Sequence, residues 1–215
     1  MTSYKNILAI GAHPDDIELG CAGTLCKFMD EGANVDIVIA RDDNAPKPSV
    51  QRTREKTISE YKASQEMLGI EFVFMNNPLT DDGRPVLEWN NTSIQQMDKL
   101  VSRKQYDLII THSPGDHHND HVNTYRIVNS ALRRYQGEFW LMECCPYANK
   151  NQEFTPTVFV DITDYIDDKI KLVSCYDSYF DDTLLHNIKN LAGFRGQMLN
   201  VSYAEAFQLR WKTIS

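Results

Sequence analysis

A run of apolar residues leads directly into one imidazole and two adjacent carboxylates in the stretch Ile7-Leu8-Ala9-Ile10-Gly11-Ala12-His13-Pro14-Asp15-Asp16. A short apolar run that ends at glycine and proline is typical of a buried parallel strand. In open α/β sheets, ligands bind at the carboxyl ends of the strands. The stretch therefore predicts that these polar side chains line a binding crevice.

A second polar cluster follows another apolar run. Residues 107–111, Asp-Leu-Ile-Ile-Thr, precede His117-His118-Asn119-Asp120-His121. Four of the six histidines lie between residues 112 and 121, which is not how buried core histidines are usually scattered. If the two strands are neighbours, both clusters share one crevice, and the combination suggests a metal site with a base beside it.

Size and composition favour one globular domain spanning residues 1–215. The net charge of −8 argues against a nucleic-acid-binding protein. No apolar run approaches the roughly 18 residues needed to span a membrane. The five cysteines form no CxxC pair, and their odd number fits no closed disulfide framework. A reduced, cytoplasmic protein is expected.

Strand-like and helix-like segments alternate along the chain, which predicts an α/β fold with a Rossmann-like, mostly parallel sheet flanked by helices on both faces. The expected strands are residues 7–12, 35–40, 71–75, 107–112, 139–143 and 157–160. The expected helices are residues 20–31, 51–68, 92–104 and 120–135. The last sixty residues suggest one more strand followed by two helices, with a break or kink near Asp181.

The spacing of the polar residues suits a divalent metal. His13 and Asp16 lie three residues apart across a proline turn, so both can point at one ion. His121 is predicted in the first turn of a helix capped by Asn119 or Asp120. Two imidazoles and one carboxylate leave open positions for water and substrate, and a metal held in this way lowers the pKa of bound water towards about 7.

The remaining polar residues suggest roles around the metal. Asp15 is a candidate general base for the metal-bound water. His118 could protonate a leaving amine or stabilise an oxyanion. Asp120 could orient a histidine by accepting a hydrogen bond from it.

Other interpretations of the same residues stay open. The HPDD stretch alone fits a proline turn with an aspartate N-cap, and HHNDH alone fits a polar loop. Two histidines and a carboxylate also form the triad of non-haem Fe(II) oxygenases, although those usually occur in β-barrels. A nucleotide-binding module would lack the expected G-x-G-x-x-G, and a degenerate protein would bind a sugar without cleaving it. Further residues are assigned as follows: Cys144-Cys145 to core packing rather than thiol ligation, His112 to support of the site, and His186 to the surface or core.

The segment from Ala12 to Thr24 resembles the AHPDD opening of the LmbE-like, or PIG-L, N-acetylglucosamine deacetylases, and His118-Asn119-Asp120-His121 resembles their H-x-D-H signature. The resemblance continues through residues 158–163, 191–196 and 203–207. It implies a zinc-dependent hydrolase that removes acetyl from an N-acetylated amino sugar or its conjugate. The roles it implies are metal ligands His13, Asp16 and His121, general base Asp15, and general acid or oxyanion partner His118.

The sequence departs from the family pattern at a few positions. Ile17 stands where many members have Glu, and Glu18 follows instead. An arginine often grips substrate at the start of the second helix, for which Arg52 and Arg54 are the nearby candidates. The metal is expected to be zinc, with Fe2+ as an alternative. The resemblance is also compatible with a homo-oligomer, and it leaves open which N-acetyl sugar is the substrate. The alternative is a family member that hydrolyses another amide or only binds a sugar or nucleotide.

Overall fold

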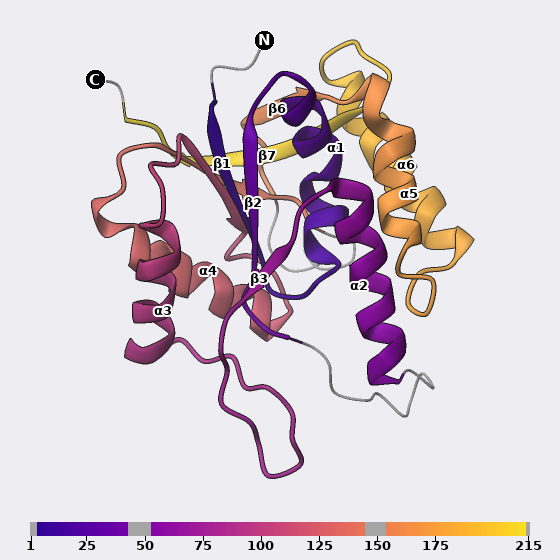
Figure 1. Ribbon diagram of the computed structural model, residues 1–215. Helices are drawn as coiled ribbons and strands as arrows, with labels where there is room; N and C mark the ends of the chain where they lie inside the picture. The colour runs from indigo at the N-terminus through magenta and orange to yellow at the C-terminus, as the bar shows by residue number, and fades with distance from the viewer. Residues whose placement is uncertain (1–3, 43–52, 145–153, 214–215) are drawn as a thin grey trace.

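The computed structural model describes residues 4–42, 53–144 and 154–213, and Figure 1 shows its helices and strands. The strands are β1 (Asn6–Gly11), β2 (Asn34–Ile39), β3 (Phe72–Phe74), β4 (Leu108–His112), β5 (Glu138–Met142), β6 (Val158–Asp161) and β7 (Ala204–Trp211). The α-helices are α1 (Asp16–Asp30), α2 (Arg54–Leu68), α3 (Asn91–Val101), α4 (Asn119–Ala131), α5 (Ile166–Ser174) and α6 (Asp182–Gln197). The 3-10 helices of the described residues are η2 (Leu132–Arg134) and η3 (Thr163–Tyr165).

The strands form one seven-stranded sheet in the order β3-β2-β1-β4-β5-β7-β6. The first five strands in this order run parallel to one another, whereas β7 runs antiparallel to both β5 and β6. The predicted adjacency of the two histidine-bearing strands is confirmed, because Ile7 of β1 pairs with Leu108 of β4. The strand order changes direction at β1 and β4, and a crevice opens at such a switch point.

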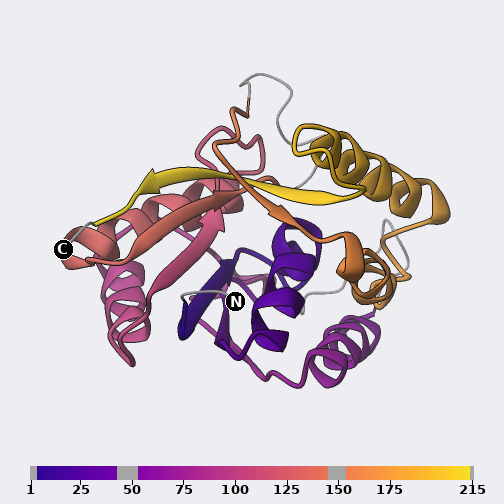
Figure 2. The same cartoon turned by 90° about the horizontal axis from the view of Figure 1, so that it is seen from above.

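The sheet has a hydrophobic core on each face. Side chains of β1 alternate between them: Ile7 and Ala9 pack in one core, Leu8 and Ile10 in the other. Helices α3 and α4 lie on one side of the sheet, and α1, α2, α5 and α6 lie on the other (Figure 2). The prediction of a mostly parallel sheet with helices on both faces is confirmed. Within the three described segments, no helix combines the length and apolarity needed to cross a membrane.

Three details of the predicted elements are wrong. The C-terminal region ends in strand β7, although its sequence AEAFQLRW is rich in helix-favouring residues. The first helix begins at Asp16, four residues before its predicted start, because Pro14 and the turn after it initiate the helix. The N-cap of α4 is His118 and not Asn119 or Asp120, since the Asp120 carboxylate contacts His13 instead of capping the helix. The predicted break is confirmed, as Asp181 is the N-cap of α6.

A buried ion pair connects α1 to α5 and β7. The Lys169 ammonium group donates to the carboxylate of Glu205 and to the carbonyl oxygens of Glu18 and Leu19. The Glu205 carboxylate in turn accepts from the backbone N–H groups of Gly23 and Thr24, at 3.1 and 2.7 Å. Both side chains therefore bond to the backbone inside α1, the helix that begins with Asp16.

Candidate metal centre

His13 and Asp16 meet in the turn that follows β1. The backbone N–H of His13 donates to Asp16 Oδ2 at 2.7 Å, and the backbone N–H of Asp16 donates to the His13 carbonyl at 3.3 Å. Asp15 occupies the N-cap position of α1, but its side chain makes no capping hydrogen bond. The Asp15 carboxylate therefore does not cap the helix, and it is available to act as a base.

Helix α4 brings His121 to the same carboxylate. His121 Nε2 lies 3.2 Å from Asp16 Oδ1, and His13 Nδ1 lies 3.5 Å from Asp16 Oδ2. The other nitrogen of each ring faces a second carboxylate: His121 Nδ1 is 2.7 Å from Asp116, and His13 Nε2 is 3.1 Å from Asp120. Carboxylates behind metal-binding histidines fix the ring orientation and the tautomer.

Among the described residues, potential metal donor atoms gather in three overlapping groups, and within each group they lie no more than 4.8 Å apart. The groups are Asp16, His112, His121 and Cys144; His13, His118 and His121; and His13, Asp15 and Asp16. The rings of His112 and His121 are stacked, with centroids 4.0 Å apart and planes 19° from parallel. An imidazole binds an ion through a lone pair in its own plane, at about 2.1 Å. Two nearly parallel planes cannot meet at one such ion, so His112 supports His121 and does not share a metal with it.

The planes of His13 and His121 are compatible with one shared ion. They are tilted by 51°, with centroids 5.5 Å apart. Together with Asp16 they supply two nitrogen donors and one carboxylate, a set that suits zinc and leaves open coordination positions. The described residues thus fit a catalytic rather than a structural metal site.

The electrostatics of the site favour a cation. Although burial lowers the pKa of His13, hydrogen bonds with Asp120 and Asp16 raise it to about 9. Burial likewise opposes protonation of His121, but Asp16 and Asp116 raise its pKa to about 10. In both rings a carboxylate stabilises a proton that a divalent cation would replace.

At Asp15 and His118 the surroundings favour the neutral form of the side chain. Burial, and then the charge of Asp16, raise the pKa of Asp15 to about 6. Burial and the neighbouring His13 and His121 lower the pKa of His118. His118 Nδ1 accepts the backbone N–H of Asp120 at 3.3 Å, and its ring lies edge-on to His13 with centroids 4.8 Å apart. Because Nδ1 makes the capping hydrogen bond, Nε2 of His118 takes no part in the helix cap.

Two neighbouring residues, Asp116 and Arg41, were not singled out from the sequence, and Cys144 was assigned only to core packing. Asp116 lies five residues before His121, and an aspartate at that position could have been read as its orienting partner. Arg41 forms an ion pair with Asp120, and Cys144 lies beside Asp16. Arg41 and Cys144 come from strand ends distant in sequence, so only the sheet order brings them together.

Several predicted residues lie away from the centre or outside the described residues. Arg54 is exposed at the start of α2, and Arg52 and Cys145 lie outside the described residues, so the arginine contact with substrate stays a prediction. His186 is exposed on α6, in line with one of its two predicted settings. Cys144 is buried in the core, as predicted for packing.

Glu18 is a buried acid that the metal groups do not include. The Ser64 hydroxyl donates to the Glu18 carboxyl group, the Tyr176 oxygen lies 2.9 Å from the same carboxyl group, and the Tyr176 hydroxyl donates to the Pro14 carbonyl. Burial raises the pKa of Glu18 from 4.5 to about 8. This glutamate, two residues after the paired aspartates, therefore anchors α1 against α2 and the segment after α5.

Replacing Glu18 by Gln is expected to stabilise the metal-free protein at pH 8 and much less at pH 5. The folded protein holds the Glu18 proton to a higher pH than an unfolded chain does, so stability falls as pH rises from about 4.5 to about 8. Gln mimics the protonated acid and removes this loss. Urea unfolding with chelator present measures the difference, and exposed Glu66→Gln is the control. A stability difference independent of pH would contradict the prediction.

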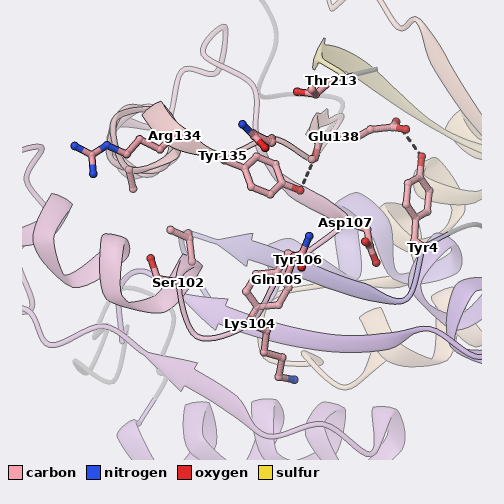
Figure 3. A pocket seen from close by; sticks show the side chains of 14 residues that line it. Tyr4, Ser102, Lys104, Gln105, Tyr106, Asp107, Arg134, Tyr135, Glu138 and Thr213 are labelled. Atoms are coloured by element: carbon pink, nitrogen blue, oxygen red, sulfur yellow. Dashed lines mark hydrogen bonds between the residues drawn. The ribbon is translucent and has the colours of Figure 1, made fainter. Parts of the chain in front are cut away.

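A separate hollow of about 580 Å3 lies at the amino ends of the strands, on the opposite edge of the sheet (Figure 3). Tyr4, Asp107, Tyr135 and Glu138 are among its lining residues. The Tyr4 hydroxyl donates to the Glu138 carboxylate at 2.9 Å, and the Tyr135 hydroxyl donates to the Glu138 carbonyl at 3.1 Å. Both of these hydrogen bonds stay within the lining, and none of the clustered histidines lines the hollow.

Comparison with known proteins gives the family. The PIG-L family, described as GlcNAc-PI de-N-acetylase, matches residues 8–132, which contain all the clustered histidines. The fold and the histidine–carboxylate centre are thus those of a PIG-L-type protein, and the chain belongs to this family. Diacetylchitobiose deacetylase from Thermococcus kodakarensis is 21% identical over 95% of this chain and 82% of its own length.

Solved structures share the fold. A conserved protein from Thermus thermophilus has a TM-score of 0.79 and 23% identity, covering 97% of this chain and 96% of its own. GalB, the 4-carboxy-2-hydroxymuconate hydratase from Pseudomonas putida KT2440, has a TM-score of 0.80 and 18% identity, covering 98% of each chain. Because a hydratase has the same fold, the fold alone does not specify the reaction, and the site residues must.

Proposed function

We propose that this protein is a zinc-dependent deacetylase that hydrolyses the acetamide group of an N-acetylated amino sugar or its conjugate. The main support is the pairing of His13 and His121 around Asp16, each ring being held from behind by a second carboxylate. The family match and the diacetylchitobiose deacetylase relative support the same reaction. The proposal includes one domain over residues 1–215 and a cytoplasmic location.

His13, Asp16 and His121 would hold the metal. A bound divalent metal polarises the acetamide carbonyl and makes water more acidic. Asp116 and Asp120 hold the two rings, and Arg41 balances the charge of Asp120. These outer contacts would keep the nitrogen donors in place during turnover.

Asp15 would move the proton, and His118 would donate a hydrogen bond from Nε2. Asp15 accepts a proton from the water whose oxygen bonds to the acetamide carbon, and His118 hydrogen-bonds to the oxyanion that develops. As the C–N bond breaks, the proton that Asp15 took from the water passes to the departing amine nitrogen, which returns Asp15 to the carboxylate. The products are acetate and a free amine.

The test is release of primary amine from a panel of N-acetylated sugars in free, glycosidic and nucleotide-linked forms. We expect release from at least one member, loss of release with chelator, and recovery on adding zinc. A zinc-loaded protein that is inactive across the panel would contradict the acetamido-sugar substrate. Other amides would then be tested, because the site also fits a family member with a different substrate.

A further inference from the structure

Cys144 lies two residues after the end of β5 and is buried beside Asp16. Its side chain and backbone together are only 5% exposed. The thiol sulfur is 3.5 Å from Asp16 Oδ1 and 3.7 Å from the Asp16 carbonyl oxygen. Both contacts therefore involve the same residue, the carboxylate shared by His13 and His121.

Two other partners of this carboxylate, His13 and His112, lie at Oδ2, whereas the thiol lies at Oδ1. Asp16 Oδ2 accepts the backbone N–H of His13 at 2.7 Å. His112 Nε2 is 3.1 Å from Oδ2, but it also lies 3.0 Å from the backbone nitrogen of Ala12. When Nε2 accepts that backbone proton, it has none to give to Asp16.

The two carboxylate oxygens thus have different partners. Oδ1 lies 3.2 Å from His121 Nε2 and 3.5 Å from the Cys144 sulfur. An ion between Asp16 and His121 would remove any proton shared by these two groups. The contact with Cys144 does not depend on that proton, because the thiol carries its own.

We propose that Cys144 is a positioning residue, whose thiol donates to Asp16 Oδ1 and fixes the carboxylate for metal binding. The inference rests on the metal site proposed above. A thiol is a weak donor, so it orients the oxygen while leaving most of its negative charge for the cation. A carboxylate without this contact could rotate away from the ion, which would lower metal affinity.

The test compares Cys144→Ala and Cys144→Ser by zinc competition against a chelator. We expect about a tenfold weaker affinity for Cys144→Ala, the lower end of the usual effect of outer-sphere partners. Cys144→Ser keeps a donor and should stay within about threefold of wild type. Cys21→Ala is the matched control, because Cys21 is a fully buried thiol on α1. Melting of the metal-free variants measures the packing loss separately.

The outcomes separate this inference from the proposed function. Wild-type affinity in Cys144→Ala, or equal losses in Cys144→Ala and Cys21→Ala, would overturn the positioning role. A thiolate-to-cobalt charge-transfer band in the cobalt-loaded wild type, lost in both Cys144 variants, would make Cys144 a ligand and also overturn it. A wild-type protein that binds no metal would contradict the proposed function and this inference together, whereas intact metal binding without deacetylation would contradict only the former.

Discussion

Replacing Asp15 by Asn is expected to lower kcat by roughly 10²- to 10⁴-fold while leaving metal affinity close to that of wild type. The substitution keeps the size of the side chain but removes the group proposed to accept a proton from water. Asp15 is the N-cap residue of α1, but its side chain makes no capping hydrogen bond, so the fold should tolerate the change. Steady-state kinetics on the best substrate of the sugar panel, with metal content measured on the same samples, gives the answer.

The neighbouring Asp16→Asn variant is the control. Asp16 lies between the rings of His13 and His121, so this variant should lose both metal and activity. The acid limb of the kcat/KM profile should also disappear in Asp15→Asn, because that limb reports the base of the free enzyme. Near-normal turnover in metal-loaded Asp15→Asn would eliminate Asp15 as the base.

Local sequence predicted the parts of the site that lie next to strands. The apolar runs before His13 and before the second histidine cluster are continuous, as expected for buried parallel strands. Pairing of Ile7 with Leu108 then brings the two clusters together without further information. The ligand and base assignments themselves remain predictions that the geometry supports.

Long-range contacts determine what the sequence did not predict. Strand β7 contains Glu205 at a buried position, which is explained by Lys169 on a separate helix and by two backbone N–H groups of α1. His118 replaces better capping residues because Asp120 contacts His13 and Arg41. In each case a tertiary partner overrides the local preference for helix or cap.

Replacing Lys169 by Met is expected to destabilise the protein by about 3–5 kcal/mol, since it leaves the buried Glu205 carboxylate without its cation. Glu205 also accepts two backbone N–H groups of α1, so it cannot turn away to find water. Chemical unfolding of the metal-free protein measures the loss. The exposed Lys171→Met, which removes only a surface contact with Asp168, should stay within about 0.5 kcal/mol of wild type.

Adding Glu205→Gln to Lys169→Met tests the electrostatic origin of this loss. Gln removes the buried charge yet keeps one carbonyl oxygen for the N–H groups of Gly23 or Thr24, so the double variant should recover part of the stability. If the double variant is less stable than Lys169→Met alone, packing of the lysine stem rather than charge compensation holds α1 in place. Because α1 begins with Asp16, Lys169→Met should also weaken metal binding, and the double variant should recover part of the metal affinity together with the stability. If the lysine acts only through local packing, metal affinity will not follow stability.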